Sequence, residues 1–346
     1  MTSFAPPISA LKDAIVTDVS APVAKRMRAI YYLRTMENEE AAKILMLGLN
    51  DKRNSPLLRH ELAYVLGQLQ LEIACAVLES VLSDIDDDVM VRHECAEALG
   101  AIGAIRSKNI LKMFANKKDE KIEVTETCEI AHNLILWNER GKIGKKPLVC
   151  ACMTPYNSVD PAPPSEEDHL SILELEKQLG NESLPLFQRY QAMFALRNKG
   201  GDAAAAALGE VLIKDQSSAL LRHEVAYVLG QMQLPAGANA LAESLRRLNE
   251  HNMVRHEAAE ALGAIVGEEE KCKILLEEFL NDADDVVRES CEVALDCQDY
   301  WSNLNNINDV NDSMQSIKII KEKSKEQMTK NDDDNGNNDT KRSAHS

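Results

Sequence analysis

The stretch LLRHELAYVLGQ, residues 57–68, decides the fold, and it returns almost unchanged as LLRHEVAYVLGQ at residues 220–231. Its apolar residues recur at steps of three and four, as in Leu62, Val65 and Leu66, and this spacing predicts an amphipathic helix. Both copies also carry an adjacent His-Glu pair inside the apolar phrase, where ionisable side chains are rare. The repetition and the His-Glu pair both need a physical explanation.

Two internal periods organise the chain. A shift of 33 residues carries His60 onto His93, and a shift of 163 residues carries His60 onto His223. The motif Arg-His-Glu occurs four times, and its pairs are His60-Glu61, His93-Glu94, His223-Glu224 and His256-Glu257. The chain is therefore a duplicated array of related units.

Each unit is predicted to be a pair of helices joined by a short turn that contains Asn, Asp or Gly. No stretch alternates convincingly with a period of two, so strands are not expected. One unit cannot bury its apolar face alone, and neighbouring units must stack. The predicted fold is all-α: an α-solenoid of HEAT-type helical hairpins in two duplicated arms, related by a pseudo-twofold axis.

Composition along the chain sets the predicted domain boundaries. We expect an N-terminal arm over residues 1–140 and a C-terminal arm over residues 169–301. Residues 141–168 are rich in proline, which prevents a continuous helix, and are predicted to be a linker between the arms. Residues 302–346 are polar and become low in complexity, so we expect a disordered tail.

The bulk composition narrows the classes of partner. The formal net charge of −17 argues against nucleic acid or an anionic membrane as the main partner. No run of about 18 apolar residues appears, and the N-terminus lacks a basic region followed by an apolar core. Cys150 and Cys152 have no second cysteine pair at zinc spacing, and other cysteines fall on apolar faces. We therefore expect a soluble, reduced, cytoplasmic protein and, as its oligomeric state, a monomer.

The four pairs predict a metal centre. Helices that pack side by side lie roughly 8–10 Å apart, so histidines at equivalent positions of neighbouring units can lean toward one point. If the linker folds the arms face to face, four imidazoles and four carboxylates surround one cleft. Two histidines and one carboxylate are a common set for non-haem Fe(II), whereas catalytic zinc takes three protein ligands and magnesium or calcium prefers oxygen. Two iron ions fit this ligand set best.

A structural role for the pairs is the competing interpretation, because a lone His-Glu on a helix is usually a surface pair or a structural histidine. The third counterpart positions have lost the pair and read Glu126-Thr127 and Glu289-Ser290, so stacking does not need it. We expect the remaining histidines, His132, His169, His251 and His345, to be structural or solvated. The arginine before each histidine is expected to pair with a carboxylate of a neighbouring unit or to orient a ligand.

Four R-H-E motifs in two halves of HEAT-like repeats, joined by a Pro-rich linker, resemble the deoxyhypusine hydroxylase family. The resemblance covers about residues 8–301, and LLRHELAYVLGQ and MVRHEAAEALGAI are similar to signature phrases of that family. It implies an O2-dependent di-iron monooxygenase that hydroxylates deoxyhypusine on the translation factor that carries hypusine. Two other classes stay open: a metal-free HEAT scaffold that binds a protein, and a two-metal hydrolase that works without O2.

The resemblance also implies roles for individual residues. One iron would be held by His60, His93 and Glu224, and the other by His223, His256 and Glu61. Glu94 and Glu257 would be spare carboxylates that face the cationic substrate. Tyr64, Tyr227, Glu97 and Glu260 stand one helical turn after a histidine, where packing and hydrogen bonding near the site are the two readings open from the residues alone.

Overall fold

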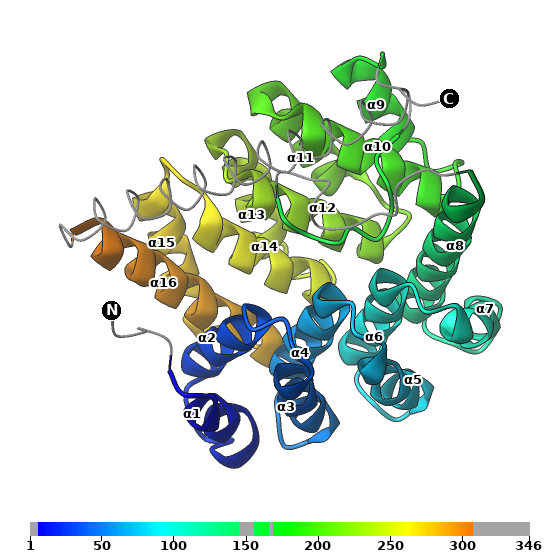
Figure 1. Cartoon of the computed structure of the whole chain (residues 1–346). Coiled ribbons are helices and arrows are strands. Elements are labelled where there is room, and N and C mark those ends of the chain that lie inside the picture. The colour runs from blue at the N-terminus through cyan, green and yellow to red at the C-terminus, as the bar shows by residue number, and fades with distance from the viewer. Residues whose placement is uncertain (1–5, 145–155, 166–168, 307–346) are drawn as a thin grey trace, which may run out of the picture. The chain divides into compact units, whose positions relative to one another are not determined.

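The computed structural model describes residues 6–144, 156–165 and 169–306, and every regular element within them is a helix (Figure 1). In the N-terminal arm these are α1 (Ile8–Lys12), α2 (Val23–Arg34), α3 (Glu39–Asn50), α4 (Pro56–Leu69), α5 (Cys75–Ser83), α6 (Val89–Ile102), α7 (Lys108–Ala115) and α8 (Ile122–Gly144). In the C-terminal arm they are α9 (Ile172–Leu179), α10 (Leu186–Lys199), α11 (Gly201–Lys214), α12 (Ala219–Met232), α13 (Pro235–Arg246), α14 (Asn252–Ala264), α15 (Glu269–Glu278) and α16 (Asp285–Asn306). The predicted all-α fold is confirmed.

Both arms belong to one compact unit, Met1–Cys297, and a second unit begins at Gln298. α8 continues four residues past the predicted end of the N-terminal arm, to Gly144. The predicted tail from residue 307 onward, with His345, lies outside the described residues, as does the part of the linker that holds Cys150 and Cys152. No helix of the described residues combines the length and the apolar character needed to cross a membrane.

Four helices, α4, α6, α12 and α14, carry the Arg-His-Glu motifs and are called the RHE helices here. Each begins at a residue whose side chain accepts a hydrogen bond from a backbone N–H of the first turn: Ser55, Asp88, Ser218 and His251. Such caps satisfy donors that the helix itself leaves without partners. The turns therefore fix where each RHE helix starts, and with it the position of the histidine five residues after each capping residue.

The arginine of the motif joins consecutive repeats. Arg59 donates to the carbonyl of Leu49 at 2.8 Å, at the end of the preceding helix, and pairs with Asp87 in the next turn. Arg92, with Leu82 and Glu120, repeats this arrangement, as does Arg255 with Leu245 and Asp282. The predicted pairing with a neighbouring carboxylate is thus found. Each RHE helix also packs closely on the helix before it, as α4 does on α3.

Small residues bring the RHE helices into close contact. A Cβ atom at Gly67 of α4 would lie 2.7 Å from the Cα atom of Ala98 in α6, and Gly100 meets Ala131 in the same way. Real side chains do not tolerate such distances, so the backbones approach as closely as they do only because glycine stands there. This approach sets the separation between His60 and His93.

Gly67→Ala is accordingly expected to force α4 away from α6. Overpacking of a well-packed core costs about 1–3 kcal/mol, and we expect the free energy of unfolding to fall by that amount in urea titrations. Ser80→Ala, an exposed change on α5, is the control and should leave stability within about 0.5 kcal/mol of wild type. Wild-type stability for Gly67→Ala would mean that the two helices separate without cost.

The arms are joined by two contacts that are equivalent under the 163-residue shift. Ser218, at the start of α12, donates to Glu126 of α8 at 2.7 Å. Ser55, at the start of α4, lies beside Glu289 of α16, which is the position equivalent to Glu126. Glu126 and Glu289, which stand where the third His-Glu pair of each arm would be, thus lie against the start of the first RHE helix in the opposite arm. A pseudo-twofold relation between the arms requires such matched contacts.

Candidate metal centre

The four predicted histidines meet between the arms. The ring centroid of His60 lies 5.4 Å from that of His93, 5.9 Å from that of His223 and 5.4 Å from that of His256. Each histidine comes from a different RHE helix, and all four are at most 6% exposed. The structure therefore collects the imidazoles of both arms into one buried cluster, as the repeat pattern predicted.

Burial controls the charge of this cluster. It lowers the pKa of His93 and of His256 well below the ordinary value, and that of His223 to about 3, so these imidazoles are neutral at pH 7. Burial also raises the pKa of Glu61 to about 8, with the nearby carboxylate of Glu260 adding to the effect. Neutral imidazoles have lone pairs free for a metal, and a cation would restore the charged form of the carboxylates.

Most polar atoms of the cluster lack a hydrogen-bond partner within the described residues. Both ring nitrogens of His93, His223 and His256 are buried without a hydrogen bond, and so is one carboxylate oxygen each of Glu61 and Glu224. A buried polar group without a partner costs about 1–3 kcal/mol, so eight such atoms in one place need a ligand. Imidazole nitrogens and carboxylate oxygens together suit a divalent transition metal.

Distances divide the ligand atoms into two overlapping sets. His60, His93 and Glu94 offer atoms within 4.8 Å of one another, and so do His60, His223 and His256. Glu94 Oε2 lies 3.1 Å from His60 Nε2, and Glu257 Oε2 lies 3.5 Å from His223 Nε2. Glu61, Glu224 and Glu257 belong to neither set, although Glu257 lies close to His223. The exchange of Glu61 and Glu224 between the arms as iron ligands stays a prediction, and the distances favour Glu94 and Glu257 in that role.

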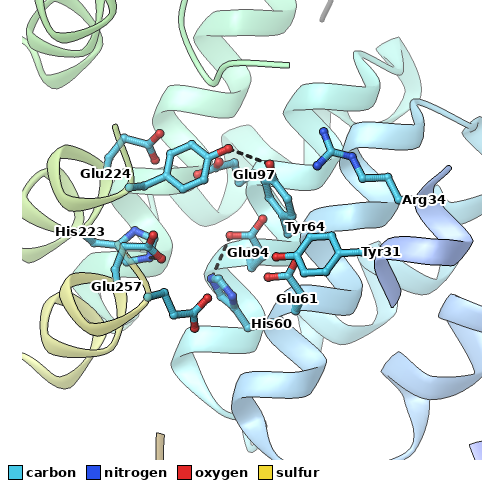
Figure 2. Close-up of a pocket in the computed structure, with 12 residues that line it drawn as sticks. Tyr31, Arg34, His60, Glu61, Tyr64, Glu94, Glu97, His223, Glu224 and Glu257 are labelled. Carbon is cyan, nitrogen blue, oxygen red and sulfur yellow. Dashed lines mark hydrogen bonds and ion pairs between the residues drawn. The ribbon is translucent and has the colours of Figure 1, made fainter. Parts of the chain in front are cut away.

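A pocket with an empty volume of about 540 Å³ opens onto the cluster (Figure 2). It is lined by Tyr31, Arg34, His60, Glu61, Tyr64, Glu94, Glu97, His223, Glu224, Tyr227, Glu257 and Glu260. Six of these residues are glutamates and one is an arginine, so the lining attracts cations. Burial raises the pKa of Glu94 and of Glu257 to about 8. A neighbouring carboxylate raises each pKa further, that of Glu257 for Glu94 and that of Glu260 for Glu257.

The tyrosines predicted beside the site contact each other across the arms. The hydroxyl groups of Tyr64 and Tyr227 are 2.7 Å apart, and the dashed line that ends on the hydroxyl of Tyr64 in Figure 2 marks this hydrogen bond. Both tyrosines therefore hydrogen-bond beside the site, and a role for them in supporting the ligands stays a prediction. Glu97 and Glu260 also line the pocket.

Of the other histidines, His251 pairs with Glu123 of the opposite arm at 3.2 Å, His132 is half-buried and His169 is exposed. None of these three lines the pocket.

Sequence reasoning did not single out Tyr31 and Arg34, which lie near the end of α2 and line the pocket. Under the 163-residue shift Arg34 lies opposite Arg197. The same shift places Phe194 opposite Tyr31, and this exchange of Phe for Tyr is the signal in the sequence that sets the two arms apart at the pocket.

Known proteins resemble this chain over most of its length. The family described as HEAT repeats matches residues 52–129 and 206–296. Human deoxyhypusine hydroxylase is 46% identical over 291 residues, which cover 83% of this chain and 91% of the relative. Deoxyhypusine hydroxylase of Dictyostelium discoideum is 43% identical over 296 residues, with 86% and 90% covered.

A solved structure agrees with these sequence relatives. The structure of human deoxyhypusine hydroxylase in complex with glycerol superposes with a TM-score of 0.77 at 45% sequence identity, over 85% of this chain and 96% of that chain. The similarity thus extends over both arms and all four RHE helices. The chain belongs to the deoxyhypusine hydroxylase family of enzymes.

Proposed function

We propose that this chain hydroxylates the deoxyhypusine side chain of the translation factor that carries hypusine, with O2 as co-substrate and two iron ions at the histidine cluster. The observation that carries the proposal is the convergence of four buried histidines and their glutamates on one acidic pocket. The family relationship supports the reaction. The absence of partners for the imidazole nitrogens among the described residues favours a metal over the alternative of a metal-free scaffold.

The reaction explains why such a centre is needed. Deoxyhypusine carries a long aliphatic chain with amino groups that are cationic near neutral pH, and its target C–H bond is unactivated. Two iron(II) ions, when bound, supply the O2 activation that no side chain in the pocket provides. The protein's own part is to bind and orient the amine chain with carboxylates, and to keep water away from the buried cluster.

The eight motif residues would hold the metals and the substrate. The four histidines would be ligands in any arrangement, because their ring nitrogens form the centre of the cluster. Glu94 lies with His60 and His93, so it and Glu257 would complete the iron sites. Glu61 and Glu224 would then face the amine chain. This assignment replaces the exchange of glutamates between arms that the resemblance implied.

Two variants separate these assignments. We expect Glu94→Ala to lower the iron content after anaerobic reconstitution, because an imidazole pair without its carboxylate holds the metal at least about tenfold less tightly. Glu61→Ala should keep iron and bind the deoxyhypusine-bearing factor about tenfold more weakly, because a charge-assisted hydrogen bond is lost. Iron content by mass spectrometry and binding under nitrogen give the two readouts. The reverse pattern would restore the exchange of glutamates.

The function itself is tested on the purified chain. About two irons per chain, together with O2-dependent conversion of the deoxyhypusine-bearing factor to its hypusine form, is the expected result. Mass spectrometry of the factor detects the added oxygen atom. A chain that takes up no iron with all eight motif residues intact would leave the scaffold interpretation, and turnover without O2 would favour the two-metal hydrolase.

A further inference from the structure

The two halves of the pocket are not equivalent. In the N-terminal arm Tyr31 is 42% exposed and lines the pocket together with Glu61. Its counterpart in the C-terminal arm under the 163-residue shift is Phe194, which is fully buried and has no hydroxyl. The duplication alone would have given both halves the same entrance, so another part of the chain makes the difference.

That part is the described piece of the predicted linker, residues 156–165, called the strap here. Asp160 of the strap is 2% exposed and receives two hydrogen bonds from Arg197, at 2.8 and 2.5 Å. The guanidinium of Arg197 also lies between two rings, 4.6 Å from the centroid of Tyr156 and 4.8 Å from that of Phe194. The strap therefore covers Arg197 in the C-terminal arm, and the guanidinium of Arg197 in turn lies over the ring of Phe194.

The strap touches the N-terminal arm in a different way. The side chain of Gln68 bonds both backbone groups of Val159, at 2.8 and 3.1 Å, and Arg34 donates to the carbonyl of Asn157 at 3.1 Å. Arg34 meets no strap carboxylate comparable to Asp160, and Tyr31 stays exposed beside it. The strap is thus held by both arms but covers the counterpart residues of one only.

We propose that the strap closes the C-terminal half of the pocket, so that the substrate side chain enters past Tyr31 and Arg34, and that Tyr31 contacts it there. This inference rests on the proposed function and assigns its entrance. Tyr31 and Glu61 both line the pocket, so the Tyr31 hydroxyl offers a polar contact to an amine chain beside that carboxylate. Phe194 is fully buried, lies outside the pocket lining and has no hydroxyl to offer. The strap thus converts a duplicated scaffold into a site with one orientation for its substrate.

The wild-type, iron-loaded enzyme gives the first test, under nitrogen so that no turnover occurs. Phenylglyoxal modifies accessible arginines, and peptide mass spectrometry reads each position separately. We expect Arg34 to react and buried Arg197 to stay unmodified. Saturation with the deoxyhypusine-bearing factor should slow labelling of Arg34 about tenfold or more, whereas the same factor with an unmodified lysine should protect it far less.

A substitution gives the second test. Tyr31→Phe copies the C-terminal counterpart, and we expect it to weaken binding of the deoxyhypusine-bearing factor about tenfold by loss of a hydrogen bond to a charged group. Tyr32→Phe, on the same helix but outside the pocket lining, is the matched control and should bind as wild type. Iron content should be unchanged in both variants.

The possible results distinguish a wrong entrance from a wrong function. If the wild-type enzyme binds and hydroxylates the factor while Arg34 is not protected and Tyr31→Phe binds normally, the entrance is wrong and the function stands. Labelling of Arg197 at the rate of Arg34 would also overturn it. If the factor is neither bound nor hydroxylated, the proposed function fails first.

Discussion

His60→Ala is expected to abolish stable iron binding and hydroxylation. His60 belongs to both groups of ligand atoms, and its ring lies within 6 Å of the three other histidines. Loss of residues that merely orient ligands costs about 10–100-fold in metal affinity, so loss of a ligand should exceed about 100-fold. Iron per chain after anaerobic reconstitution is the direct readout, and conversion of the deoxyhypusine-bearing factor follows from it.

The control for this variant is His132→Ala. His132 is half-buried on α8 and does not line the pocket. We expect it to keep both iron and activity. Full iron content in His60→Ala would show that the cluster is not the metal site, whereas iron loss in both variants would point to a general opening of the arms.

The repeats made the site predictable from the sequence. Because His60, His93, His223 and His256 occupy one position in four related helices, their alignment could be seen without any structure. Stacked helices then had to bring them together, since glycines such as Gly67 allow close approach. The acidic character of the pocket followed from the same four motifs. A periodic pattern thus carried three-dimensional information that an isolated His-Glu pair would not.

What could not be predicted depends on segments outside the repeats. Asp160 has no counterpart under either shift, and nothing in its neighbourhood shows that it meets Arg197, 37 residues away. Tyr31 differs from its counterpart Phe194 by one hydroxyl group. Tyr31 is exposed because the strap does not cover its side of the pocket. The choice among the glutamates also failed to follow from spacing, because each motif places its carboxylate beside a histidine and only side-chain distances distinguish Glu94 from Glu61.

Asp160→Ala is expected to lower the free energy of unfolding by about 3–5 kcal/mol, because it leaves the buried charge of Arg197 without its partner. The side chains of this pair are 1% and 0% exposed, so water does not replace the lost carboxylate. Thermal and urea unfolding measure the change. Activity measured below the unfolding transition should also fall, because a strap freed from Arg197 no longer fixes the closed half of the pocket.

Glu39→Ala is the matched control for the ion pair. It removes the carboxylate of an exposed pair with Lys43 at 3.3 Å and should change stability by less than about 0.5 kcal/mol. Arg34→Ala tests the asymmetry between the arms, since Arg34 occupies the position of Arg197 but bonds only the carbonyl of Asn157. We expect it to cost far less stability than Asp160→Ala. Equal losses would mean that the strap holds both arms alike, and the pocket would then have no preferred side.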